Sequence, residues 1–183
     1  MEQHQLKIKQ RCRELFPNGF SLESFERSFE ENQDVIKNNR NVIKNLRIDD
    51  VDTVIKSFKT PNFIQGMIYK FVRKTKAERS YEHSLILNEM GIKTPEPLCY
   101  IEVFDRFRLR QSYFISRKID YDFTLEFATQ KEAKNHKDIL KSFIDFTYKL
   151  HKKNIMHLDY VVGNICVKNC LLYTSPSPRD DEL

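Results

Sequence analysis

Residues 157–164 read HLDYVVGN, and this stretch decides how the rest of the chain is interpreted. It has the spacing H-x-D-x-x-x-x-N. In phosphoryl transfer, one carboxylate accepts the proton of the attacking hydroxyl, and a nearby amide oxygen holds magnesium against the phosphates. Asp159 and Asn164 are the candidates for these roles, and His157 is expected to brace the loop. Because three fixed residues recur by chance with a probability on the order of a few per cent, the preceding elements have to support this interpretation.

The segments upstream follow an order that does so. The patterns predict a helix over residues 22–31 with Ser21 as its cap. A strand meander follows, in which Val35-Ile36 leads into a turn at Asn38-Asn39 and further strands cover 41–48 and 51–58. Apolar residues then recur at helical spacing within 61–74. A helix over 76–90 follows, and Gly91 ends it. A hairpin over 98–104 and 108–119 turns at Asp105, and a helix over 136–153 leads into the motif. A strand begins at 165.

This order predicts an α+β, protein-kinase-like fold, with a small lobe built of an antiparallel sheet and one helix. We expect a polar, partly helical segment over 1–33, the small lobe over 34–119, and the start of a truncated large lobe over 120–169. Residues 170–183 are expected to be a non-native tail.

The third strand carries the candidate nucleotide contacts. Alternate side chains of a strand share a face, so Val54 could lie on the adenine while Lys56 reaches the phosphates. A solvated strand lysine is the alternative interpretation, and Lys59 is a rival three residues further on.

A lysine in this role needs an acid on the following helix to hold its ammonium group. Glu82 is the choice because it lies in mid-helix, where a side chain can face the sheet. Glu78 and Glu89 lie nearer the helix ends and are expected to be solvated.

The turn expected to cover the phosphates contains no glycine. It reads Asn38-Asn39-Arg40, and all four glycines lie elsewhere. Backbone amides of this turn could still contact phosphate, and Arg40 could add positive charge.

Composition limits the class of protein. Hydrophobic residues make up 40% of the chain and aromatic residues 12%, which argues against disorder. The net charge of +5 favours an anionic partner. The scattered cysteines, Cys12, Cys99, Cys166 and Cys170, are expected to be reduced thiols in a cytosolic protein. No signal segment or transmembrane run is evident.

The C-terminal stretch CLLYTSPSPRD, from Cys170 to Asp180, reads like a translated sequencing adapter. We therefore expect the natural chain to diverge after Lys168 or Asn169, and the tail to be unpacked. We also expect that the intact protein transfers phosphate and that these 183 residues alone do not.

Four stretches together resemble the bacterial lipopolysaccharide core kinase family, which acts on heptose or Kdo sugars. They are KSFKTPNF from Lys56, RSYE from Arg79, GIKTPEP from Gly91 and LHKKNIMHLD from Leu150. The resemblance implies ATP- and Mg²⁺-dependent phosphorylation of a lipid-linked core oligosaccharide at the inner face of the cytoplasmic membrane. It implies the roles given above for Lys56, Glu82, Asp159 and Asn164. Val161-Val162 departs from the Ser-Pro usual in that family.

Residues 63–79 are expected to face the membrane. Phe63, Ile64, Met67, Ile68, Phe71 and Val72 form one helical stripe, and Lys70, Arg73, Lys74, Lys76 and Arg79 follow it. The alternative is that the stripe packs on the sheet. For the whole protein, the alternatives are another small-molecule or protein acceptor and a non-catalytic pseudokinase scaffold. A nucleic-acid binder is disfavoured because no recognised motif supports it.

Overall fold

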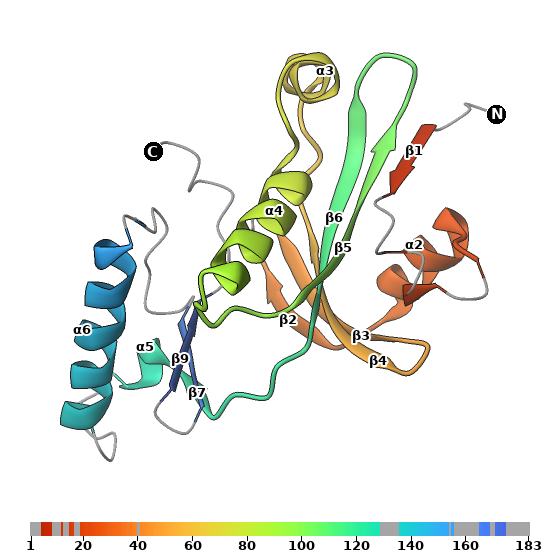
Figure 1. The fold of residues 1–183 in the computed structure, drawn as a ribbon. Helices are drawn as coiled ribbons and strands as arrows, with labels where there is room; N and C mark the ends of the chain where they lie inside the picture. The colour runs from red at the N-terminus through yellow and green to blue at the C-terminus, as the bar shows by residue number, and fades with distance from the viewer. Residues whose placement is uncertain are drawn as a thin grey trace. The chain divides into compact units, whose positions relative to one another are not determined.

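A computed structural model describes residues 5–8, 12, 15–16, 19–39, 41–128, 136–153, 155, 165–168 and 171–174. Two compact units divide the chain. The first comprises residues 1–82 and 96–118, and the second comprises 83–95 and 119–183. Figure 1 shows the elements of both units along the chain.

The first unit is built on a six-stranded sheet with the order β1-β5-β6-β4-β3-β2 (Figure 1). The strands are β1 (Gln5–Ile8), β2 (Val35–Asn38), β3 (Val42–Ile48), β4 (Val51–Ser57), β5 (Pro97–Phe104) and β6 (Leu109–Arg117). All of the paired strands are antiparallel. The five predicted strands are confirmed. The sixth, β1, was not predicted, because four residues within a polar segment carry too little pattern to show pairing with a distant strand.

The N-terminal residues cover one face of this sheet. Helix α2 (Leu22–Glu31) buries Phe25 and Phe29 against Ile55, Ile101 and Ile115 of the strands. Both faces of this contact are apolar, so the cluster is the principal core of the unit.

Cys12 and Cys99 form a disulfide within this core. The prediction of reduced thiols is therefore wrong for this pair. The two residues are 87 positions apart in the sequence, and no local pattern indicates that the N-terminal segment returns to β5.

Helix α2 is fixed at both ends. Ser21 is its N-cap and accepts a hydrogen bond from the amide of Ser24, as predicted. At the other end the Nζ atom of Lys44 donates to the carbonyl oxygens of Phe29 and Asn32, at 2.7 and 2.9 Å. A buried ammonium group at a helix C-terminus satisfies orphan carbonyls and complements the helix dipole.

The first turns of helix α4 (Lys76–Glu89), which belong to the first unit, lie on the opposite face of the sheet. Thr75 caps its start, since its hydroxyl accepts a hydrogen bond from the amide of Glu78 at 3.1 Å. Gly91, at φ +72°, follows its end as predicted, because a left-handed residue is needed there. The ring of Tyr81 contacts that of Tyr100 in β5, with the centroids 5.6 Å apart.

Helix α3 (Phe63–Phe71) begins after Asn62, whose side-chain oxygen accepts a hydrogen bond from the amide of Gln65 at 2.8 Å. It lies beside the β5–β6 hairpin (Figure 1). That hairpin turns at Asp105 as predicted, because the Asp105 carboxylate accepts the amide hydrogens of Phe107 and Arg108.

The second unit contains β7 (Phe123–Thr124), α5 (Leu125–Ala128), α6 (His136–Lys152), β8 (Ile165–Lys168) and β9 (Leu171–Thr174). Leu125, Ile139, Ile165 and Val167 form its buried cluster. Part of the tail that was expected to be unpacked forms β9, whose backbone pairs with β8 from Ile165–Thr174 to Lys168–Leu171. A strand edge can take up any neighbouring residues of high β propensity, and LLYT has such residues.

Among the described residues, no helix is both long and apolar enough to cross a membrane.

Candidate functional site

Val54 and Lys56 lie on the sheet face that α4 covers. In β4 the side chains of Thr53, Ile55 and Ser57 are buried, and Val54 and Lys56 alternate with them. Lys56 is paired in register with Phe114 of β6, and Phe114 is paired with Tyr100 of β5. Because residues directly opposite each other share a face, Lys56 is on the same face as Tyr100, which contacts α4 through Tyr81.

The Asn38-Asn39 turn lies at the end of the sheet nearest Lys56. Lys56 of β4 is paired in register with Ile43 of β3. One residue further along, Ser57 is paired with Val42, and Val42 is paired with Asn38 of β2. The Oδ1 atom of Asn41 accepts the amide hydrogen of Lys59 at 3.3 Å, which links the turn to the end of β4. Asn38 and Asn39 are exposed, and the amide of Asn39 donates a hydrogen bond to the carbonyl oxygen of Asn41 at 3.3 Å.

Glu82 lies on α4 with its carboxylate partly exposed. Both of its oxygen atoms are 2.7 Å from the Nζ atom of Lys74. The hydrogen bond to Glu82 raises the pKa of Lys74, so this ammonium stays charged at neutral pH. The structure thus gives Glu82 a cationic partner from the loop before its helix, and its predicted role toward Lys56 stays a prediction.

The remaining predicted site residues, Arg40, His157, Asp159 and Asn164, lie outside the described residues. Within the described ranges, no group of three or more His, Cys, Asp or Glu side chains is placed to hold a metal ion.

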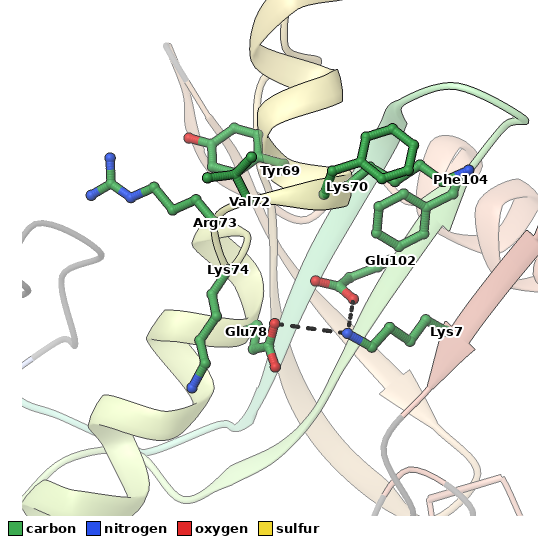
Figure 2. A pocket seen from close by; sticks show the side chains of 10 residues that line it. Lys7, Tyr69, Lys70, Val72, Arg73, Lys74, Glu78, Glu102 and Phe104 are labelled. Carbon is green, nitrogen blue, oxygen red and sulfur yellow. Dashed lines mark ion pairs between the residues drawn. The ribbon is translucent and has the colours of Figure 1, made fainter.

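A cavity of about 480 Å³ lies beside the start of α4. Figure 2 shows the Nζ atom of Lys7 between two carboxylates, 3.9 Å from Glu78 and 3.5 Å from Glu102. The other lining residues are Tyr69, Lys70, Phe71, Val72, Arg73, Lys74 and Phe104. The lining includes neither Lys56 nor Val54. Glu102 is two residues from Tyr100 in β5, so the cavity lies on the same sheet face as Lys56.

The two glutamates of this cavity are buried. Glu102 is fully buried in β5, and Glu78 is 8% exposed. The expectation that Glu78 is solvated is therefore wrong, because the first turn of α4 is the part that faces β5 and β1. Burial raises the pKa of Glu102, although Thr75 and Lys7 oppose this effect.

A Glu102→Gln variant should be more stable than the original protein at neutral pH, by on the order of 1 kcal/mol. A raised pKa means that the folded state binds the proton more tightly than the unfolded state. Stability therefore falls as pH rises from the ordinary glutamate pKa toward the folded one. The glutamine side chain does not ionise, so the variant does not lose stability in this way as the pH rises. Its stability gain over the original protein should shrink as the pH is lowered.

Denaturant titrations of both proteins across the acidic range measure this difference. Glu96→Gln is the matched control, since Glu96 forms an exposed ion pair with Arg117 at 2.8 Å and should have little effect. A Glu102→Gln variant that is less stable than the original protein at pH 7 would contradict the raised pKa of Glu102.

One sequence signal could have found Glu102. It is the only charged residue in the otherwise buried strand PLCYIEVF, and an acid within such a run is rarely a surface residue. Lys7 had no comparable signal, since its pairing depends on β1.

Comparisons with known proteins support the fold. No protein-family model matches the chain, and no curated protein matches it. A solved structure described as "WaaP in complex with acyl carrier protein" is similar, with a TM-score of 0.59 and 13% sequence identity. The match covers 96% of this chain and 71% of that chain. This likeness and the antiparallel sheet of the first unit confirm the predicted α+β fold with a kinase-like small lobe.

Proposed function

We propose that this protein is an ATP-dependent kinase that phosphorylates a heptose or Kdo sugar of the lipopolysaccharide core. One observation carries the proposal. Val54 and Lys56 share the sheet face that α4 covers, and the Asn38-Asn39 turn lies at the same end of the sheet. This arrangement occurs in a fold similar to that of WaaP, and the H-x-D-x-x-x-x-N motif follows it in the chain.

Each residue has a chemical role in this proposal. Lys56 donates hydrogen bonds to phosphate oxygens, Val54 contacts the adenine, and Glu82 keeps the Lys56 ammonium in position. Backbone amides of the Asn38-Asn39 turn, with the guanidinium of Arg40, would contact the phosphates. The Asp159 carboxylate accepts the proton of the sugar hydroxyl. The hydroxyl oxygen then bonds to the γ-phosphorus as the bond to the ADP oxygen breaks.

Asn164 is proposed to hold Mg²⁺ through its amide oxygen, which suits a hard cation. The ion would neutralise charge that develops on the phosphate oxygens. Residues of the natural protein beyond Lys168 would supply a second carboxylate ligand, as the kinase mechanism needs. We therefore infer that these 183 residues alone do not catalyse phosphoryl transfer.

The acceptor and the location follow from the same proposal. A sugar of the core oligosaccharide is linked to lipid, so the enzyme would work as a peripheral protein on the inner face of the cytoplasmic membrane. A kinase-fold enzyme with another small-molecule or protein acceptor, and a pseudokinase scaffold, are the competing functions.

A transfer assay separates these functions. The protein with its natural sequence restored after Lys168 is incubated with Mg²⁺ and ATP labelled in the γ-phosphate, together with core oligosaccharide. We expect label in heptose or Kdo. Label only in a protein substrate or in another small hydroxyl compound would reject the acceptor but keep the kinase. ATP binding without transfer to any acceptor would support the scaffold instead.

A further inference from the structure

Helix α3 turns its apolar stripe toward solvent. Ile64, Phe71 and Val72 are 70%, 65% and 82% exposed, and Phe63, Met67 and Ile68 are also exposed. These six residues fall at spacings of three and four, so they share one side of the helix. A contiguous apolar stripe of this kind indicates an interaction surface, and the alternative that it packs on the sheet is wrong.

The opposite side of α3 is what attaches the helix to the sheet. Gly66 is buried, and a Cβ atom built on it would lie 2.9 Å from the carbonyl oxygen of Leu109. Glycine is therefore required for this close approach to the β5–β6 hairpin. The Nζ atom of Lys70 donates to the carbonyl oxygens of Asp105 and Arg106, each at 2.8 Å. These contacts fix which side of the helix faces outward.

The hairpin turn extends the exposed surface. Phe107 at the turn is 56% exposed, and its ring lies 5.5 Å from the guanidinium carbon of Arg106. The guanidinium carbon of Arg108 lies 5.3 Å from the ring centroid of Phe63. The contact between Arg108 and Phe63 thus joins the hairpin to α3.

The cations predicted for this surface need revision. Lys70 binds backbone carbonyls, Lys74 binds Glu82, and Arg79 is buried, where desolvation lowers its pKa. Arg73, beyond the end of α3, and Arg106 in the hairpin turn are exposed. The apolar stripe must therefore supply most of the binding free energy toward any partner of this surface, and the charged residues a smaller part.

We propose that the α3 stripe and the β5–β6 turn together form a surface that inserts into an anionic lipid bilayer. We call this the α3 surface, and it consists of Phe63, Ile64, Met67, Ile68, Phe71, Val72, Arg73, Arg106 and Phe107. A single helix with aromatic and aliphatic side chains on one side and flanking arginines has the chemistry of an interfacial element. The arginines complement anionic headgroups.

This inference deepens the proposed function, because a lipid-linked acceptor needs the enzyme at a bilayer, but its test does not use activity. Vesicle binding is measured by co-sedimentation with phosphatidylethanolamine–phosphatidylglycerol vesicles and with neutral phosphatidylcholine vesicles. The original chain should bind both, and bind the anionic vesicles more tightly. Ile64→Ser and Phe71→Ser should each weaken vesicle binding by about tenfold, since each removes a large apolar side chain that would enter the bilayer.

Ile144→Ser is the matched control, because Ile144 is 65% exposed on α6 and lies outside the α3 surface. It should leave vesicle binding unchanged. Circular dichroism establishes that all of the variants remain folded, which is expected for exposed positions.

Several outcomes would overturn the inference. These are no binding by the original chain, equal loss in Ile144→Ser, and unchanged binding in both α3 variants. A stripe that instead mediates self-association, or one that binds acyl carrier protein but no vesicle, would also overturn it. Failure of phosphoryl transfer alongside intact vesicle binding would reject the proposed function and leave the α3 surface in place.

Discussion

In any form of the protein that transfers phosphate, Asp159→Asn should lower turnover by about 10²–10⁴-fold, the usual contribution of a general base. An amide has nearly the same shape as a carboxylate, but it cannot accept the proton of the sugar hydroxyl. Nucleotide affinity should stay within about twofold, because this residue is assigned to the acceptor and not to ATP. Rates of sugar phosphorylation at saturating ATP measure the effect.

Asp145→Asn is the control for this experiment, because Asp145 is an exposed acid on α6. It should leave turnover unchanged. If Asp159→Asn retained most of the original rate, the H-x-D-x-x-x-x-N motif would not be the catalytic loop, and the proposed mechanism would be wrong.

Local patterns were sufficient for most of the elements. The predicted bounds of α2 agree with Leu22–Glu31, and the predicted helix over 76–90 agrees with Lys76–Glu89. Both helices have a capping hydroxyl at the start, and a glycine follows the second. The 2-residue alternation of β4 placed Val54 and Lys56 on one face, because the side chains of a strand must alternate.

Long-range pairing was not predictable. β1 joins β5 across more than 90 residues, and Cys12 and Cys99 of the disulfide are 87 positions apart. Both depend on how the N-terminal segment returns to the sheet, and a single sequence has no periodic signal for that. Glu78 was placed wrongly for the same reason, because its burial depends on β1 and β5 meeting the first turn of α4.

The outward direction of the α3 stripe was also open to two interpretations. An amphipathic pattern shows that one side of a helix is apolar, but not whether that side meets a core or a partner. Gly66 decides between them, because its buried side approaches the backbone of Leu109 and leaves the apolar side outward.

The sheet face that holds Lys56 is proposed to bind nucleotide, and the affinity of the 183-residue chain for Mg²⁺-ATP is the measurement that decides this. Isothermal titration calorimetry compares the original chain with Lys56→Met and with Lys59→Met. Lys59 is an exposed lysine three residues away, so it controls for the loss of positive charge from the same region.

We expect Lys56→Met to weaken ATP binding roughly 10- to 100-fold, as loss of a hydrogen bond to a charged phosphate does. Lys59→Met should bind ATP within about twofold of the original chain. If the original chain binds no ATP, or if Lys59→Met loses affinity while Lys56→Met keeps it, Lys56 is not the phosphate-binding lysine and the account of this site is wrong.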